Sequence, residues 1–184
     1  MPNYHRHFQP GGTFFFTVVT YKRHPIFNTS SARQLLGEAF RTAMERYPFS
    51  MVAVCLLPDH LHCIWTLPEN DINYSIRWGF IKSFFTHRYN DRDTSSSKTD
   101  RSREKRREKG VWQRRFWEHF IRDELDLEVH FDYIHYNPVK HGYVQYVDEW
   151  EWSSFHRYLE LGWYSKGWND QNKGEKLIIS DIWD

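Results

Sequence analysis

A pair of histidines inside a predicted β-hairpin is the feature that most constrains how this chain can fold. Two runs of apolar and β-favouring residues, 50–57 and 60–67, are joined by the turn Leu57-Pro58-Asp59. So short a connection indicates antiparallel neighbours. Side chains two positions apart on a strand share a face, so His60 and His62 project together. Two imidazoles held side by side on a strand are the beginning of a metal site.

Hydrophobic patterns around the hairpin predict the order β-α-β-β-α-β and then one added helix. The further elements are strands at 13–20 and 110–121 and helices at 32–47, 73–89 and 123–137. This order predicts an α+β, ferredoxin-like split βαβ fold, in which a four-stranded antiparallel sheet carries two helices on one face. The added helix, 123–137, is expected beside the other face, where the histidines point.

Local signals set the expected helix ends and faces. Ser30-Ser31 can cap the first helix, and Pro48 and Pro138 are expected to end the first and third helices. Helical spacing in the second helix predicts one apolar face and one charged face. The residues expected to point inward are Ile76, Phe80 and Phe84, and those expected to point outward are Arg77, Lys82 and Arg88.

The chain is predicted to form one catalytic domain, 1–146, with a C-terminal tail, 147–184, packed on it. The tail carries five tryptophans without clear periodicity. Within the domain, the segment from about 91 to 110 lacks large apolar residues and is predicted to be a mobile charged loop. Its stretch 92–109 holds eight basic and four acidic residues, so it is either a solvated insertion or an arm that touches phosphates.

Composition narrows the functional classes. The formal net charge is +1, which argues neither for nor against a polyanionic partner. Aromatic side chains make up 18% of the chain and can fill a core or stack on unpaired bases. The two cysteines form no disulfide framework, and neither a signal peptide nor a membrane-length apolar run is evident. These features predict a cytoplasmic protein with no membrane partner.

A tyrosine and an asparagine on the added helix extend the histidine pair to a candidate active site. Tyr133 and Asn137 are four residues apart and therefore share a helical face. The two imidazoles and the Asn137 carbonyl oxygen could hold a divalent cation, which would neutralise a phosphodiester while the Tyr133 hydroxyl attacks it. A phenol is almost fully protonated at pH 7, with a pKa of about 10. The metal, Lys140 and Lys82 would favour its ionised form.

The residue pattern leaves rivals for both roles open. Tyr136 and Tyr143 are alternative nucleophiles. His130 is an alternative ligand, because it lies three residues before Tyr133 and near the same helical face. His135, two residues from Tyr133, is a second alternative but is expected to point elsewhere.

The sequence resembles the REP-associated tyrosine transposases, relatives of the insertion-sequence transposases that use one catalytic tyrosine and a His-hydrophobe-His motif. The matching stretches are GGTFFFTV (11–18), LPDHLHCIWTLPE (57–69), WQRRFWEH (112–119) and DYIHYNPVKHG (132–142). The resemblance implies that His60 and His62 are metal ligands, that Tyr133 is the nucleophile, and that the ion is Mg²⁺ or Mn²⁺. Insertion-sequence relatives commonly have glutamine where Asn137 stands.

The resemblance further implies a DNA-nicking and DNA-joining enzyme. Its substrate would be single-stranded DNA with hairpins from repetitive extragenic palindromes, cut through a 5′-phosphotyrosine intermediate that leaves a free 3′-hydroxyl. A bacterial, nucleoid-associated location and a monomer are expected, with a dimer as the alternative. Two other functions stay open: a non-catalytic protein that binds structured single strands, and a metal-dependent hydrolase that uses water.

Basic side chains near the predicted strands and helices are the candidates for DNA contact, through phosphates or guanine edges. They are Arg6, Lys82, Arg114, Arg115 and Lys140.

Overall fold

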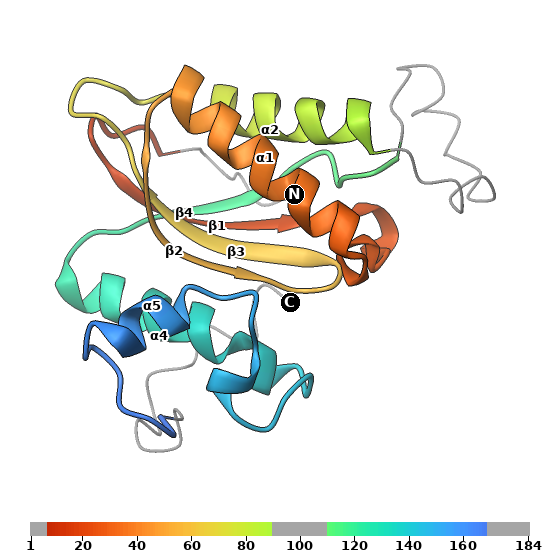
Figure 1. Cartoon of the computed structure of the whole chain (residues 1–184). Coiled ribbons are helices and arrows are strands. Elements are labelled where there is room, and N and C mark those ends of the chain that lie inside the picture. Colours follow the sequence, from red (N-terminus) through yellow and green to blue (C-terminus); the bar gives the residue numbers. More distant parts are fainter. Residues whose placement is uncertain (1–6, 90–109, 169–184) are drawn as a thin grey trace, which may run out of the picture.

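A four-stranded antiparallel sheet with helices on both faces forms the protein (Figure 1). The structure is a computed structural model that describes residues 7–89 and 110–168. Arg6, the predicted charged loop and the end of the tail lie outside the described residues. The elements are β1 (Thr13–Val19), α1 (Ser30–Arg46), β2 (Ser50–Leu56), β3 (His60–Thr66), α2 (Tyr74–Arg88), β4 (Trp117–Phe120), α4 (Glu124–Lys140) and α5 (Phe155–Glu160). The predicted α+β architecture is confirmed.

The sheet has the order β2-β3-β1-β4, so the histidine strand β3 lies in its interior. β1 pairs with β3 in a register that sets Thr17 opposite His62 and Val19 opposite His60. A strand hydrogen-bonded on both sides holds its side chains in fixed directions. The histidine pair therefore stands on a rigid base.

The fourth strand is much shorter than the predicted segment 110–121. β4 has four residues, and upstream of it only Trp112 forms an isolated bridge, to Thr20. The residues between them, Gln113, Arg114 and Arg115, are exposed. Their polar side chains would gain nothing from burial in the sheet, so the strand does not extend through them.

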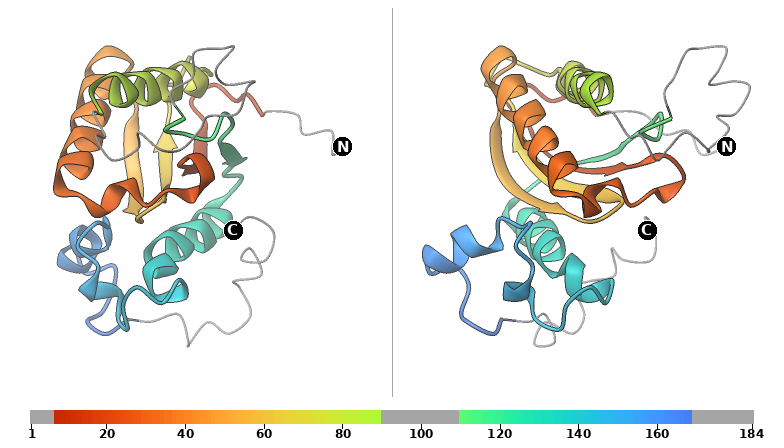
Figure 2. Two further views of the ribbon diagram at one scale, coloured as in Figure 1. Left: turned by 90° about the vertical axis from the view of Figure 1, so that its right-hand side faces the viewer. Right: turned by 45° about the vertical axis from the view of Figure 1, so that its right-hand side comes forward.

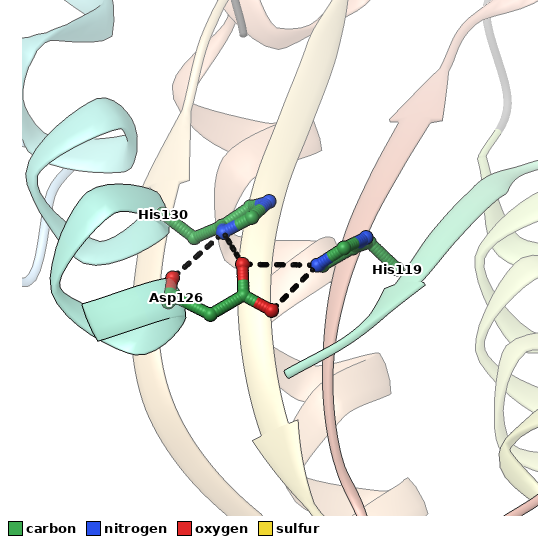
Figure 3. Close-up of side chains that lie close together, drawn as sticks. All are labelled: His119, Asp126 and His130. Atoms are coloured by element: carbon green, nitrogen blue, oxygen red, sulfur yellow. Dashed lines mark hydrogen bonds and ion pairs between the residues drawn. The ribbon is translucent and has the colours of Figure 1, made fainter. Parts of the chain in front are cut away.

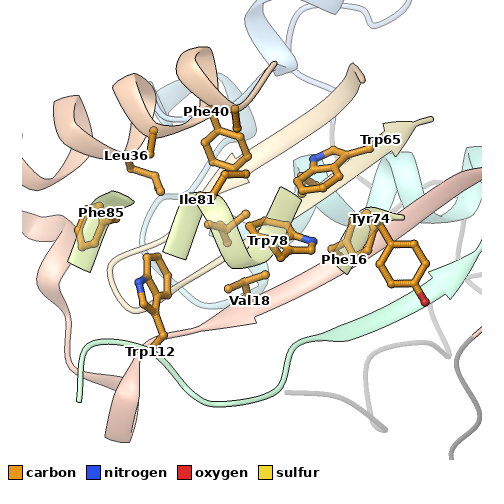
Figure 4. Close-up of a cluster of buried hydrophobic side chains, with 14 of the residues drawn as sticks. Phe16, Val18, Leu36, Phe40, Trp65, Tyr74, Trp78, Ile81, Phe85 and Trp112 are labelled. Atoms are coloured by element: carbon orange, nitrogen blue, oxygen red, sulfur yellow. The ribbon is translucent and has the colours of Figure 1, made fainter. Parts of the chain in front are cut away.

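Helices α1 and α2 cover one face of the sheet and build the larger hydrophobic core (Figure 4). Trp65 of β3 and Trp78 of α2 stack with ring centroids 4.4 Å apart. The cap of α1 is Thr29, whose hydroxyl accepts a hydrogen bond from the Ala32 amide, rather than the predicted Ser30-Ser31. The shift is one residue and leaves the helix in its expected place.

The predicted orientation of α2 is wrong at Ile76 and Arg77, whereas Arg88 is exposed and Phe80 and Phe84 are partly buried against the core, as predicted. Arg77 is 1% exposed, whereas Ile76 is 42% exposed. The helix buries a different stripe, made of Tyr74, Trp78, Ile81 and Phe85. Both stripes obey helical spacing, and the bulky ring of Trp78 gains more by burial than Ile76 does.

Arg77 can be buried because its guanidinium is hydrogen-bonded on several sides. It donates to Asp71 Oδ2 at 2.7 Å and to the carbonyl oxygens of Pro48, Asn73 and Tyr47 at 2.6, 2.9 and 3.2 Å. These bonds tie α2 to the connection between α1 and β2. The ion pair also holds the pKa of Asp71 below its ordinary value.

Replacing Arg77 by methionine should lower the free energy of unfolding by about 3 kcal/mol, because buried carbonyls and Asp71 lose their donor. Urea unfolding measures the change. Arg88→Met, on the exposed side of the same helix where the guanidinium packs on Phe84, should cost less than about 1 kcal/mol. Equal losses in the two variants would contradict a structural role for Arg77.

Helix α4 and the segment after it cover the other face of the sheet, as the two rotated views make clear (Figure 2). Phe15 and Ile64 from the sheet pack in one cluster with Phe131 and Ile134 of α4. The helix runs to Lys140, so the expectation that Pro138 ends it is wrong. A proline in the last turn removes only one helical hydrogen bond, and the His141 amide still donates to the Asn137 carbonyl at 3.0 Å.

Residues after α4 cover the outer edge of β2. The amide of Leu56 donates to the carbonyl of Trp152, the amide of Ser154 donates to that of Val54, and Ser153 forms a bridge to Cys55. The Trp150 indole adds a hydrogen bond to the Leu56 carbonyl at 3.0 Å. This part of the predicted tail thus packs on the domain. Among the described residues, no helix has the length and apolar character needed to cross a membrane.

Candidate active site

His60 and His62 are fully buried on the sheet face that α4 covers, and each uses one ring nitrogen to bind a neighbour. The Nδ1 atom of His60 lies 2.6 Å from Asp59 Oδ1, and that of His62 lies 2.9 Å from Thr17 Oγ1. Both Nε2 atoms are buried and have no hydrogen-bond partner among the residues that the structure describes. When Nδ1 carries the proton and donates it to these neighbours, the Nε2 lone pair of each ring is available to a ligand.

Helix α4 lays one face along this histidine pair. Its Tyr133 ring lies 5.3 Å from the His62 ring, and the His141 ring at its C-terminal end lies 5.3 Å from the His60 ring, centroid to centroid. Asn137 is one turn from each of them on the same helical face. The predicted meeting of the tyrosine helix with the two-histidine strand is therefore present within one chain.

Asn137 is the third member of the site with unsatisfied polar atoms. The residue is fully buried, and neither its Oδ1 nor its Nδ2 has a hydrogen-bond partner within the described part of the chain. A buried amide without partners is costly and calls for an explanation. A ligand held between β3 and α4 would supply one.

The residues present fit a divalent cation. Two imidazole nitrogens and one amide oxygen, all buried and unsatisfied, could supply two nitrogen ligands and one oxygen ligand without any charge of their own. Such a set accepts a divalent first-row ion or Mg²⁺ when substrate oxygens and water complete the coordination.

Burial keeps the His62 imidazole in the neutral form that can bind a metal. Burial, followed by the neighbouring positive charges, holds the pKa of His62 well below its ordinary value, so the ring is neutral at pH 7. Burial opposes ionisation of Asp59, but the hydrogen bonds from His60 and Arg23 and the charge of Arg23 favour it, and the pKa of Asp59 lies below its ordinary value. The carboxylate therefore accepts from His60 Nδ1–H.

Tyr133 combines burial with a nearby cation. It is 3% exposed, and Lys140 Nζ lies 5.1 Å from the centre of its ring. This cation–π contact places a positive charge beside the phenol. Of the predicted basic residues that the structure describes, Lys140 is the one that lies at the site.

The other predicted DNA contacts lie elsewhere or outside the described residues. Lys82 is on α2, over the opposite face of the sheet, where its ammonium donates to the Gln113 carbonyl at 2.6 Å. Arg114 and Arg115 are exposed in the segment before β4. Arg6 is not among the described residues.

The alternative ligands His130 and His135 form hydrogen bonds with other residues, and the alternative nucleophile Tyr143 is largely exposed. His135 contacts the Tyr164 hydroxyl and the Ser154 hydroxyl at 2.9 and 2.8 Å, and burial lowers its pKa to about 3. It points away from the histidine pair, as expected. His130 uses Nδ1 on the Asp126 carbonyl at 2.8 Å. Tyr143 is 44% exposed beyond the end of α4.

A second cluster, not foreseen from the sequence, joins β4 to the start of α4 (Figure 3). His119, Asp126 and His130 bring their ligand atoms within 4.8 Å of one another, close enough to hold an ion. The two imidazole rings, however, stack at 15° with centroids 4.4 Å apart. Imidazole lone pairs lie in the ring plane, and two nearly parallel planes do not meet at one ion near the nitrogens.

Hydrogen bonds account for this second cluster. Asp126 accepts from His119 at 2.9 Å and from the Arg122 guanidinium at 2.9 Å, and His130 Nδ1 lies 3.1 Å from its other oxygen. The carboxylate thus ties β4, the following turn and α4 together. It fixes the helix that carries Tyr133 and Asn137.

Acid should weaken this tie. Burial opposes ionisation of Asp126, but bonds from Arg122 and His119 outweigh it and hold the carboxyl pKa well below its ordinary value. The unfolded chain binds the proton first, so stability is present above about pH 4 and falls as the pH drops below it. Urea unfolding at about pH 6 and pH 3 should show a smaller acid loss in Asp126→Asn than in the wild type. Glu45→Gln, a change at an exposed position of α1, is the control and should lose as much stability in acid as the wild type. If Asp126→Asn also loses as much stability as the wild type, protonation of Asp126 is not a cause of the acid loss.

Three residues of the site were missed from the sequence. Asp59 lies inside the recognised motif, but its role as the His60 partner depends on a side-chain rotation that spacing does not give. Thr17 reaches His62 from 45 positions away. His141 follows Asn137 by four residues, so the helical spacing that linked Tyr133 to Asn137 would have found it had the helix not been expected to end at Pro138.

Comparison with known proteins identifies the class to which this fold and site belong. Residues 12–137 match the family model described as Transposase IS200 like. The chain therefore belongs to the IS200-like transposases.

Within that class it belongs to the REP-associated tyrosine transposases. It is 40% identical to the Escherichia coli REP-associated tyrosine transposase over 182 residues, covering 97% of this chain and 99% of the relative. It is 46% identical to a Haemophilus influenzae protein assigned to the same group, with 91% and 93% covered. A solved structure of a REP-associated tyrosine transposase bound to a REP hairpin superposes with a TM-score of 0.76, at 40% identity and 92% coverage of both chains.

Proposed function

We propose that the protein is a metal-dependent single-strand DNA endonuclease and strand-transferase acting on REP-type hairpins through a 5′-phosphotyrosine intermediate. The proposal rests on three buried residues with unsatisfied ligand atoms, His60, His62 and Asn137, which lie on the strand and the helix that meet where the His62 and Tyr133 rings are 5.3 Å apart. The hairpin substrate is proposed because a 40% identical relative was solved bound to a REP hairpin.

In this proposal His60, His62 and Asn137 hold the ion, Mg²⁺ or Mn²⁺. Bound there, it would neutralise phosphate charge and stabilise the pentacovalent transition state. Thr17 and Asp59 keep the two imidazoles oriented with Nε2 toward the site. The rigid strand and the anchored helix hold these groups in place before substrate arrives.

Tyr133 supplies the nucleophile. Its phenolic oxygen forms a bond to the scissile phosphorus and loses its proton, while the bond from phosphorus to the 3′-oxygen breaks. The leaving 3′-oxygen takes a proton and becomes a hydroxyl, and the 5′-phosphate stays on the tyrosine. Because the phosphotyrosine bond conserves the energy of the broken linkage, a 3′-hydroxyl can reverse the step on the same or another strand. Lys140 favours the phenolate by its charge.

Incubation with a 5′- and 3′-labelled hairpin strand and Mn²⁺ tests the proposal. A denaturing gel should show the protein shifted by the DNA piece that carries the new 5′ end, and a released piece that ends in a 3′-hydroxyl. Cleavage without a shifted protein would instead identify a hydrolase that uses water. Binding without cleavage would identify a non-catalytic hairpin-binding protein.

The monomeric state and a cytoplasmic, nucleoid-associated location belong to the same proposal. Tyr133 lies beside His62 of its own chain, so one chain supplies both halves of the site without a partner. Light scattering of the purified protein, with and without hairpin DNA, tests the oligomeric state.

A further inference from the structure

Arg23 stands at an unusual backbone position next to the histidine pair. Lys22 and Arg23 have φ angles of +53° and +52°, in the left-handed region that non-glycine residues rarely adopt, and they follow each other in the turn η1 (Tyr21–Arg23). Such a conformation persists only where surrounding contacts enforce it. At this turn, Thr20 and Arg23 both form hydrogen bonds with Asp59.

The turn is fastened to the backbone of Asp59 through the buried Thr20. The amide and the hydroxyl of Thr20 both donate to the Asp59 carbonyl at 2.8 Å, and the Arg23 amide donates to the Thr20 carbonyl at 3.2 Å. Two tight bonds to one carbonyl fix the start of the turn relative to β3. The left-handed residues then aim the Arg23 side chain back toward the site.

The Arg23 side chain and His60 occupy the two oxygens of one carboxylate. Arg23 Nη1 donates to Asp59 Oδ2 at 3.2 Å, and His60 Nδ1 lies 2.6 Å from Oδ1. The Asp59 side chain is 13% exposed and that of Arg23 is 41% exposed. The guanidinium therefore spans from the buried His60 partner to solvent at the edge of the site.

We propose that Arg23 binds a backbone phosphate of the DNA at the histidine pair while holding Asp59 against His60. The inference rests on the proposed function. A guanidinium has five N–H donors in a rigid plane, so one can bind Asp59 while others face a phosphate. Arg23 is thus a positioning residue for the metal pair and a phosphate contact. Neither role was foreseen from the sequence.

Arg23→Gly and Lys22→Gly form a matched pair for the test. Each removes one positive charge and places glycine at a positive φ, which glycine adopts without strain, so neither should lower the melting temperature. Only the first removes the guanidinium that contacts Asp59. If Arg23→Gly melts early, Arg23→Gln carries the same measurements.

The first measurement is hairpin DNA binding in EDTA across a range of NaCl concentrations. Loss of one phosphate contact on single-stranded DNA should reduce the slope of log Kd against log salt by about 0.7. The second is Mn²⁺ affinity without DNA, measured by electron paramagnetic resonance, which should fall about tenfold as His60 loses its fixed partner. Lys22→Gly should leave both values unchanged.

An unchanged salt slope and unchanged Mn²⁺ affinity in Arg23→Gly would overturn the inference. Equal changes in Arg23→Gly and Lys22→Gly would also overturn it, because they would indicate a general effect of charge. Both readouts are independent of cleavage, so a wild-type protein that binds DNA and Mn²⁺ but forms no adduct would refute the proposed function and leave this inference to be judged on its own.

Discussion

Tyr133→Phe should abolish the covalent protein–DNA adduct, with a loss of at least about a thousandfold in the rate of strand cleavage. The change removes only the phenolic oxygen, which is the atom proposed to bond to phosphorus. The ring keeps its contacts with His62 and Phe15, so folding and Mn²⁺ binding should be retained. Denaturing gels with labelled hairpin DNA measure the adduct, and gel-shift titration should show hairpin binding nearly unchanged.

Tyr136→Phe is the matched control, since Tyr136 lies three residues along the same helix. It should form the adduct at close to the wild-type rate. If the adduct survives in Tyr133→Phe and disappears in Tyr136→Phe, the nucleophile has been assigned to the wrong tyrosine. Survival in both single variants would direct attention to Tyr143.

Exchanging both His60 and His62 for alanine should eliminate metal binding and cleavage together. The two Nε2 atoms are the only proposed nitrogen ligands, and losing both should weaken Mn²⁺ binding by more than about a hundredfold. Calorimetric titration with Mn²⁺ measures the affinity, and circular dichroism verifies that the buried substitutions leave the fold intact.

The double variant His87→Ala with His156→Ala removes two histidines from outside the site and should bind Mn²⁺ normally. Wild-type Mn²⁺ affinity in the His60/His62 variant would place the ion elsewhere, and the cluster of His119, Asp126 and His130 would then be the next candidate.

The sheet and its histidine face were predictable because their signals are local. Apolar and β-branched residues run through 13–19, and the hairpin turn fixes the direction of its two strands. The two-residue period then placed His60 and His62 on one face without any long-range information. Tyr133 and Asn137 followed from helical spacing in the same way.

The errors arose where packing partners decide between local alternatives. Helical spacing allows either Arg77 or Ile76 to face the core. Arg77 is the buried residue because the Pro48 carbonyl and the Asp71 carboxylate accept hydrogen bonds from its guanidinium. Pro138 was read as a stop, although the last turn of a helix tolerates it. Thr17, Asp59 and Arg23 support the site through contacts between strands and turns far apart in the chain, which no spacing rule reveals.

The segment 152–154 has a consequence for self-association. By occupying the backbone groups of β2, it closes one side of the sheet to any strand from another copy of the chain. Truncation before Trp152 would uncover a hydrogen-bonding edge and the apolar side chains beneath it. A shortened chain of that kind should therefore precipitate or form strand-paired oligomers even if every residue around the histidine pair is retained.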